Sequence, residues 1–564
     1  MKLEDLDSKE QIFKDFFEWL FDDSKITAKE IQLEKEVDIT LAPYYLDSNI
    51  YYPKQFKNFF ETRAMKRLER VSQVSLAIDL NPNLYQNRLE HSKGVYYRKL
   101  EEMVYNFQDY KWRQKVEKEN LKLYLIAELI KMAGHDIGHF PFSHAFEEQV
   151  FHCHGIHEEA GKKIMLEDPE IINVLNIISP DLPEILEELY NIKFWNFSEH
   201  DESNYDVDRL DYIQRDNLYW GTPINLPHLK YKTVSVKTDE AGKVLKNTDN
   251  SILVTSSSDK TIDVYSYSDL SKIEKLLELR EDGYKNKIYM VPYSHIRESS
   301  IGVFFNSLLE TPSNCGNELI NYINTVKNTD IKNIDLNLLL NWDDIKVYSE
   351  IIDIAQNHEN GNIRKLATLV IPKLNGFLNF IYSCINLKSP QKQYTDSEKD
   401  FLRKVKKIIY GNNELSQNMK NQNFIAENTL YVENPSSEYN DEILQYFLSN
   451  QLILKQNCKI KAYNPNNPIY IKNLDGKIYE LSQHPKRKFD WKTRISYNKS
   501  LYTYIPYLKF KGVSDKEIEL IKNKFQQLGQ IGQNFNFTEH KCVVNMQPLQ
   551  NGHNFSKVFK ELEL

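Results

Sequence analysis

Cysteine is scarce in this chain of 564 residues, and the few thiols lie far apart. The five cysteines are Cys153, Cys315, Cys384, Cys458 and Cys542. No two of them are close enough along the chain to suggest a zinc knuckle, and scattered thiols fit a reducing compartment better than a disulfide framework. The sequence therefore argues against a small, disulfide-stapled secreted domain and predicts free thiols.

Long apolar runs and a surplus of positive charge are also missing. No stretch approaches the roughly 18 consecutive apolar residues that span a bilayer, and the acidic N-terminus lacks the apolar segment of a signal peptide. Lysine and arginine number 72 against 80 aspartates and glutamates, so the formal net charge is −8. A general nucleic-acid-binding protein would carry a basic excess. We expect a cytoplasmic protein with no membrane association and no strong nucleic-acid binding, which leaves room for a local pocket for a small phosphorylated ligand.

Apolar periodicity predicts that helices dominate the fold. Apolar side chains recur at spacings of three and four over 53–76, 119–135 and 204–220, and each stretch is expected to form a helix with one buried face. Residues 225–290 change character, because segments such as 251–255 alternate apolar and polar side chains as strands do. These patterns predict a mainly α fold with a β-containing insertion.

Three regions follow from the same patterns. Residues 1–45 are expected to form an N-terminal extension with one amphipathic helix. Residues 46–385 would form a central helical domain that includes the insertion at 225–290. After a polar, proline-containing linker, Asn-rich loops separate helices from short strands, which predicts a mixed α/β C-terminal lobe over 386–564.

Histidine is concentrated in one part of the chain. Seven of the 14 histidines are His91, His135, His139, His144, His152, His154 and His157. Crowded imidazoles repel one another when charged, and metal coordination relieves this because it keeps the ligating rings neutral. Surface or satisfied core histidines are the ordinary alternative. We retain that alternative for His152 and His154, but it explains seven poorly.

His135 and Asp136 place a nitrogen ligand and an oxygen ligand side by side at the end of an apolar helix. His139 would face the same cavity if that helix continued for another turn. Two histidines with one or two aspartates suit Mn, Fe, Zn or Ni better than Ca. We therefore expect a divalent transition metal with an open position for water and a phosphoryl oxygen, with Mg on the substrate phosphates as an alternative.

Four phrases, taken in their order along the chain, resemble one family. They are Arg88-Leu-Glu-His-Ser-Lys-Gly-Val95, His135-Asp-Ile-Gly-His-Phe-Pro-Phe-Ser-His144, Ile156-His-Glu158 and Tyr205-Asp-Val-Asp-Arg-Leu-Asp-Tyr212. The chain resembles the deoxynucleoside triphosphate triphosphohydrolase branch of the HD superfamily, which includes a mammalian lentiviral restriction factor. The resemblance covers residues 50 to 310 and, more weakly, the C-terminal lobe, and it implies an HD-domain helical core within 46–385.

The resemblance also implies roles for individual side chains. The metal ligands would be His91, His135, Asp136 and Asp208. The catalytic group would be His139, His144, Glu147 and His157. His144 would be the general acid, with Glu147 orienting it and raising its pKa, while the other two histidines would bind phosphate oxygens. A helix cap for Asp208 and a solvated side chain for Glu147 are the ordinary alternatives.

Further residues would contact the substrate. By resemblance these are Gln73, Arg88, Arg209, Tyr212, Asp216 and Arg297. The three arginines would contact phosphates and the other three would hold the sugar, with Val74 beside the 2′ position. An exposed residue on an amphipathic helix is the alternative for Gln73, and a surface arginine the alternative for Arg297. Phe305 stands where the family has a tyrosine that covers the sugar.

The implied reaction is metal-dependent hydrolysis of a dNTP to deoxynucleoside and triphosphate, with attack at the α-phosphorus. It would lower the dNTP pool, in housekeeping or in antiviral defence. Two alternatives stay open, namely another HD phosphohydrolase such as a nucleotidase or single-strand nuclease, and a nucleotide-sensing regulatory subunit without turnover. The resemblance further implies a homo-oligomer (dimer, tetramer or hexamer) and a nucleotide effector, for which the sequence identifies no site.

Overall fold

The structure, a computed structural model, describes most of the chain between residues 3 and 562. The residues outside its description are 1–2, 28–31, 38–48, 80–83, 154, 192–204, 225, 227–228, 230, 257–259, 284–287, 289–291, 312, 373, 386–393, 412, 421–429, 435–453, 462, 465–466, 492–494, 505–513, 528–554, 556–558, 561 and 563–564. His154 is among them. The predicted domain boundaries at 45/46 and 385/386 fall within or beside these ranges, so they stay predictions.

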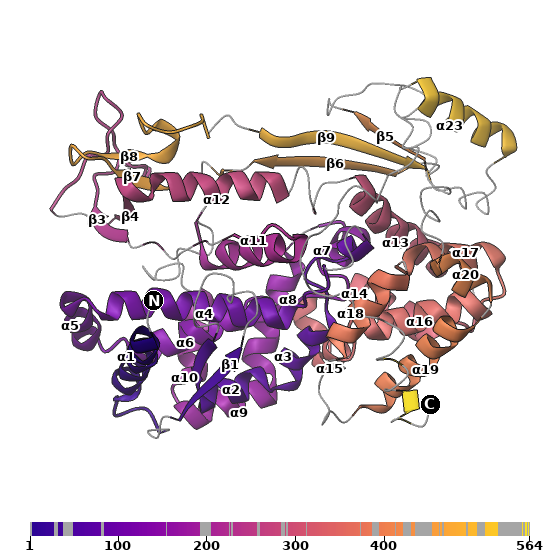
Figure 1. Cartoon of the computed structure of the whole chain (residues 1–564), viewed down its shortest axis with the longest axis horizontal. Helices are drawn as coiled ribbons and strands as arrows, with labels where there is room; N and C mark the ends of the chain where they lie inside the picture. The colour runs from indigo at the N-terminus through magenta and orange to yellow at the C-terminus, as the bar shows by residue number, and fades with distance from the viewer. Residues whose placement is uncertain are drawn as a thin grey trace.

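The fold is mainly helical with small sheets, which confirms the predicted fold class. Helix α4 (Arg88–Phe107) is mostly buried and packs on α6 (Lys122–Ala133) and α11 (Val207–Trp220), between which it lies in Figure 1. Asn87 caps α4 by accepting a hydrogen bond from the backbone N–H of Glu90. This capping fixes where the helix begins, and so places the residues of its first turn.

The N-terminal helix α1 (Leu3–Phe21) belongs to the same core. Phe13, Phe16 and Phe17 are buried in the cluster that includes the apolar side chains of α4 and α6. Several aromatic rings meet there, for example Phe16 and Phe107 with ring centroids 5.5 Å apart. The apolar side chains of α1 from Ile12 to Phe21 therefore pack as part of the site-bearing core.

Two predicted helices differ from the sequence expectation. The stretch 53–76 is broken into α2 (Lys54–Phe60) and α3 (Arg63–Arg67), because Thr62 caps α3 and interrupts the first helix. Helix α6 ends at Ala133, so His135 and His139 lie in a turn rather than on a continued helix. The condition that the helix continues for another turn is therefore not met, since Gly134 terminates it.

The bounds of the remaining helices and strands are as follows. The helices are α5 (Tyr110–Glu119), α7 (His144–Phe146), α8 (Ile156–Glu167), α9 (Pro169–Ile178), α10 (Leu182–Asn191), α12 (Leu270–Asp282), α13 (Pro292–Glu310), α14 (Asn317–Asn328), α15 (Leu336–Leu340), α16 (Asp344–Asn357), α17 (Gly361–Val370), α18 (Leu374–Cys384), α19 (Asp396–Tyr410), α20 (Glu414–Lys420) and α23 (Asp515–Gln527). The strands are β1 (Leu33–Val37), β2 (Asn49–Pro53), β3 (Tyr231–Ser235), β4 (Thr261–Ser266), β5 (Leu430–Asn434), β6 (Leu454–Lys461), β7 (Tyr470–Lys472), β8 (Ile478–Glu480) and β9 (Ile495–Tyr504).

The strands of the insertion form a sheet with strands from the C-terminal lobe. The sheet order is β3-β4-β7-β8, with β4 and β7 parallel. Leu276 and Leu277 of α12 share one buried cluster with Ile471 of β7. The segment 251–255, predicted as a strand, makes only isolated bridges, and α12 was not predicted. The insertion and the C-terminal strands thus share a sheet and a core.

The lengths and hydropathy of the helices bear on membrane association. Among the described residues, no helix is both long enough and apolar enough to cross a membrane.

The shared core predicts that a strand of the C-terminal lobe stabilises the insertion. Ile471 is fully buried, so Ile471→Ala should lower the free energy of unfolding by about 2–5 kcal/mol. Leu474 lies on the same hairpin and is 83% exposed, so Leu474→Ala is a matched control with a change below about 0.5 kcal/mol. Denaturant unfolding measures both. Equal stabilities of the two variants would contradict the shared core.

Candidate active site

Helix ends bring the four predicted metal ligands together. His91 lies in the first turn of α4 and Asp208 in the first turn of α11. His135 and Asp136 lie in the turn that follows α6. Asp206 caps α11 through the backbone N–H of Arg209, so the capping role considered for Asp208 falls to Asp206.

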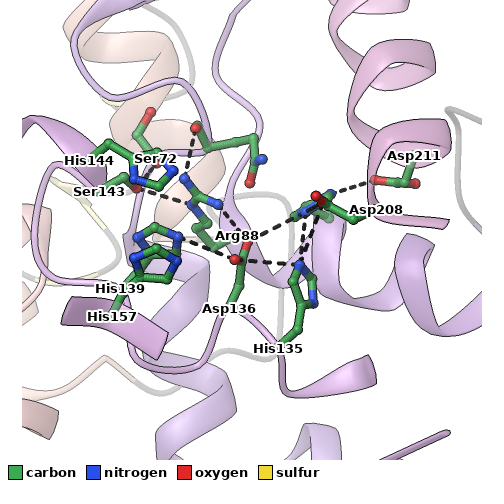
Figure 2. Close-up of polar contacts among 12 residues, drawn as sticks. Ser72, Arg88, His135, Asp136, His139, Ser143, His144, His157, Asp208 and Asp211 are labelled. Carbon is green, nitrogen blue, oxygen red and sulfur yellow. Dashed lines mark hydrogen bonds and ion pairs between the residues drawn. The ribbon is translucent and has the colours of Figure 1, made fainter. Parts of the chain in front are cut away.

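Donor atoms of His91, His135 and Asp208 lie within 4.8 Å of one another, and the carboxylate of Asp136 lies beside both histidines (Figure 2). Nε2 of His91 lies 3.0 Å from Oδ1 of Asp208 and 3.4 Å from Oδ2 of Asp136. Nε2 of His135 lies 3.3 Å from Nε2 of His91 and 3.4 Å from Oδ1 of Asp136. Ligands held about 2.1 Å from one ion stand about 3.0–3.4 Å apart around it. The donor set and most of its spacings therefore fit a transition-metal ion, and the distance of 3.7 Å from Nε2 of His135 to Oδ1 of Asp208 is longer.

Asp211 orients one of these ligands. Its Oδ2 lies 2.7 Å from Nδ1 of His91, and both of its oxygens accept hydrogen bonds from Arg215 at 2.9 Å. A carboxylate on the far nitrogen fixes the ring and makes it a better ligand. The spacing of four residues between Asp211 and Arg215 predicts this ion pair, whereas the contact with His91 was not predicted. The signal for the second role was the spacing of three residues from Asp208, which puts both side chains near one helix face.

Gly94 allows α4 and α11 to approach closely at this point. A Cβ at position 94 would clash with the carboxylate of Asp211 and the guanidinium of Arg215. The glycine of the His-Ser-Lys-Gly phrase therefore leaves room for the Asp211–Arg215 pair, which lies behind His91.

The two ligand carboxyls are ionised at neutral pH. Burial alone would raise the pKa of Asp208, but hydrogen bonds from His135 and His91 outweigh it and lower that pKa. Burial of Asp136 is likewise outweighed by the positive charges nearby, chiefly Arg88, and its pKa falls well below the ordinary value. Two negative charges therefore face the space between the ligands, where a divalent cation would neutralise them.

A second group of histidines lies beside the first. The rings of His139 and His157 stack with centroids 4.0 Å apart, and the ring of His144 lies 4.8 Å from that of His139. Glu147, which is fully buried, holds two of them, with Oε2 at 3.2 Å from Nδ1 of His144 and Oε1 at 2.9 Å from Nδ1 of His157. The sequence predicted the contact of Glu147 with His144 and missed the one with His157.

Gly138 explains why α8 can bring His157 so close. A Cβ at position 138 would clash with the backbone carbonyl of His157 and the backbone nitrogen of Gly161. The turn after α6 thus packs backbone against backbone on α8, which stacks His157 on His139.

The protonation of His144 differs from the prediction. Burial lowers the pKa of His144 and outweighs the hydrogen bond with Glu147, which raises that pKa as predicted. The expectation that Glu147 keeps His144 cationic is therefore not met in the protein alone. Burial, with Arg88 and His157 nearby, also lowers the pKa of His139. A bound polyphosphate would add negative charge that favours the imidazolium of His144.

Arg88 and Asp136 join the two groups (Figure 2). Nη1 of Arg88 donates to Oδ2 of Asp136 at 2.5 Å, and Oδ1 of Asp136 lies 3.2 Å from Nε2 of His139. Nε of Arg88 donates to Oγ of Ser143 at 3.1 Å. The guanidinium predicted to contact the triphosphate therefore lies between the metal ligands and the histidine group.

The predicted sugar-binding residues are near-buried, and a further glutamine joins them. Gln73 is 8% exposed, and its Oε1 accepts no hydrogen bond from the described residues. Asp216 accepts a hydrogen bond at 2.7 Å from Nε2 of Gln86. The other amide atom of Gln86, Oε1, is buried and has no hydrogen-bond partner among the residues that the structure describes. Tyr212 is half-buried against the α12 core. No sequence signal pointed to Gln86, whose burial comes from tertiary packing.

Three other residues named in the sequence analysis contact neighbouring protein groups that hold the fold together. Arg209 pairs with Asp206, its helix cap. Arg297 is fully buried and donates to the backbone carbonyls of α17, including that of Val370 at 2.7 Å. Its predicted phosphate contact therefore finds no support. Phe305 is buried against Phe146 in the helical core, with ring centroids 5.8 Å apart.

Sequence comparison finds partial relatives. No family model matches the chain. An uncharacterized protein of Bacillus subtilis is 35% identical over 164 residues, which cover 28% of this chain and 35% of that protein. A putative HD domain-containing protein of Acanthamoeba polyphaga mimivirus is 30% identical over 197 residues, covering 31% and 42%. A Dictyostelium discoideum homolog named as a deoxynucleoside triphosphate triphosphohydrolase is 29% identical over 189 residues, covering 30% and 34%. The chain thus spans less than half the length of these curated relatives.

Structure comparison extends the similarity over more of the chain. A crystal structure of a phosphohydrolase from Bacteroides thetaiotaomicron matches with a TM-score of 0.52 and 16% sequence identity, covering 84% of this chain and all of that one. This likeness shows a shared fold. Taken with the relatives, it supports an HD-type phosphohydrolase and does not single out one substrate.

The ligand geometry predicts metal content. Asp136→Ala and Asp208→Ala should each lose the bound metal, because each removes a carboxylate from a four-residue donor set. Asp211→Asn should weaken metal affinity about 10- to 100-fold by releasing the ring of His91. Elemental analysis after dialysis measures all three, with Asp330→Asn, a change at an exposed helix cap, as the control. Equal metal content in the wild type and every variant would overturn the ligand assignment.

Proposed function

We propose that this HD-type phosphohydrolase hydrolyses dNTPs to deoxynucleoside and triphosphate in a metal-dependent reaction. The observation that carries the proposal is the link through Asp136 and Arg88, which sets a metal-ligand group directly beside a histidine group. The name of the Dictyostelium relative supports the same reaction. Lowering of the dNTP pool, in housekeeping or antiviral defence, follows from that reaction.

The metal would be held by the four residues of the first group. A divalent ion there would supply positive charge to the phosphates and lower the pKa of water. The carboxyls of Asp136 and Asp208, both ionised, suit the binding of a cation. A donor set of two histidines and two aspartates suits several divalent transition metals, so Mn, Fe, Zn and Ni all fit it.

His144 would supply the proton for the leaving group. In the proposed reaction water attacks the α-phosphorus and loses a proton to the solvent, the bond from that phosphorus to the 5′ oxygen breaks, and the oxygen takes a proton from His144. Since Nδ1 of His144 faces Glu147, the proton would come from Nε2, the other nitrogen of the ring. His139 and His157 would hold phosphate oxygens and offset the charge that develops there, which is most of the catalysis in a loose phosphoryl transfer.

Product analysis tests this reaction. The purified protein with Mn²⁺ and each dNTP should release triphosphate, and His144→Ala should lower kcat by about 10²–10⁴-fold with the metal retained. His152→Ala is the matched control, because His152 is an exposed histidine of the same stretch. Release of pyrophosphate or of single phosphates would replace the proposal with another HD chemistry. Tight nucleotide binding without any product would favour a sensor.

The sugar pocket is proposed to select deoxynucleotides. Gln73 and Asp216 would bind the 3′-hydroxyl, and the buried side chain of Val74 would leave a 2′-hydroxyl without a partner. Burying such a group costs about 1–3 kcal/mol, so kcat/KM for dGTP should exceed that for GTP by about 10- to 100-fold. Dideoxy-GTP should also be poor.

Two variants test the selection. Gln73→Ala should reduce the preference for dGTP over dideoxy-GTP, and Gln86→Ala should do the same by removing a hydrogen bond that orients the carboxylate of Asp216. Gln11→Ala, at an exposed position of α1, is the control. Steady-state kinetics on the three nucleotides measure all of them. Equal rates on dGTP, GTP and dideoxy-GTP in the wild type would remove the deoxynucleotide preference.

A further inference from the structure

The start of α16 lies against two loops that lead to predicted site residues. Oδ1 of Asp344 accepts a hydrogen bond from the backbone N–H of Phe142 at 2.7 Å, and Oδ2 accepts one from the backbone N–H of Ser72 at 2.9 Å. Asp344 is 1% exposed. One buried carboxylate therefore holds two segments that are 70 residues apart in the sequence.

The same two segments are joined a second time. Oγ of Ser143 donates to the backbone carbonyl of Ser72 at 2.8 Å, and Ser143 also accepts from Arg88 (Figure 2). Ser72 immediately precedes Gln73, which is proposed to contact the sugar. Ser143 immediately precedes His144, the proposed acid. The two segments thus carry the two ends of the proposed nucleoside site.

The segment before His144 has a costly backbone conformation. Phe142 and Ser143 have φ angles of 61° and 53°, in the left-handed region that residues with side chains rarely adopt. Such a conformation persists only when the surroundings fix it. The hydrogen bond from the N–H of Phe142 to Asp344 and those of the Ser143 hydroxyl supply that fixation.

The carboxyl group of Asp344 is buried at a cost in free energy. Burial raises the pKa of Asp344 to about 7, against the two backbone N–H groups, which lower it. Burying this carboxyl group costs free energy that a neutral side chain would avoid. What the carboxylate offers in return is two oxygens, each of which accepts a backbone hydrogen bond.

The start of α16 is also anchored to the other side of the site. Arg67 donates to the backbone carbonyl of Trp342 at 3.1 Å and to those of Ile137 and His139 at 2.8 Å. Arg70 pairs with Asp343 at 2.6 Å. Asp344 therefore projects from a segment whose own position is fixed relative to His139.

We propose that Asp344 is a positioning residue that couples the sugar side of the nucleoside site to the acid side. Its two hydrogen bonds hold the segments of Gln73 and His144 in one arrangement, so that recognition of the sugar and protonation of the 5′ oxygen occur in the same geometry. The inference rests on the proposed function, because it concerns how that site is assembled.

Asp344→Asn tests the coupling, since the amide keeps the shape but places an NH₂ group against a backbone N–H. It should lower kcat on dGTP by about 10- to 100-fold and reduce the dGTP to GTP preference by at least about threefold, with metal content unchanged. Ser143→Ala, which removes the second connection, should shift both quantities in the same direction by less. Asp335→Asn, at an exposed helix cap, is the control. A merely structural residue would lower the active fraction and leave the preference between nucleotides unchanged.

Hydrogen–deuterium exchange supplies a readout that does not depend on activity. Asp344→Asn should speed exchange in peptides covering 70–76 and 140–146, while Asp335→Asn should not. Unchanged exchange in both peptides, or an unchanged dGTP to GTP ratio beside a lowered kcat, would overturn the coupling. If the wild type releases no triphosphate, the proposed function fails, and exchange alone decides whether Asp344 holds the two segments. If Asp344→Asn does not fold, Ser143→Ala carries the same comparison.

Discussion

The carboxylate of Asp136 is the interaction on which the rest of the site depends. One oxygen accepts from Arg88 and faces His91, and the other faces His135 and His139. Each oxygen is thus shared between the metal-ligand group and the groups expected to meet phosphate. Removing one partner of a buried charge pair such as Arg88 and Asp136 costs about 3–5 kcal/mol. A change at Asp136 should therefore disturb metal binding, phosphate contact and local stability together.

Helix ends and glycines supply the geometry around this carboxylate. The ligands lie in first turns or just beyond a last turn, where side chains from different helices converge. Gly94 and Gly138 let backbones approach where a Cβ would clash, which brings Asp211 behind His91 and His157 onto His139. The close approach of backbones at these two glycines therefore helps to set where His91 and His157 lie. The hydrogen bonds of Asp344 likewise hold backbone segments of the site together, and they come from α16, which lies outside the four sequence phrases.

Much of this could be predicted from the sequence because the informative residues are close together along the chain. The histidine concentration and the four phrases brought His91, His135, Asp136 and Asp208 into one group, and the structure places their donor atoms around one space, although their roles stay predictions. Helical periodicity predicted the fold class. By contrast, β4 and β7 are about 200 residues apart, and local alternation carries no information on such a pairing. The burial of Arg297, the pKa of His144 and the roles of Gln86 and Asp344 depend on neighbours from distant segments in the same way.

In the proposed reaction water attacks the α-phosphorus while the 5′ oxygen leaves with a proton from His144. Turnover of dGTP in water labelled with oxygen-18, followed by mass spectrometry of both products, tests this most directly. One labelled oxygen is expected in the triphosphate and none in the deoxynucleoside. Label in the 5′-hydroxyl of the deoxynucleoside, or formation of deoxynucleoside monophosphate with pyrophosphate, would contradict it.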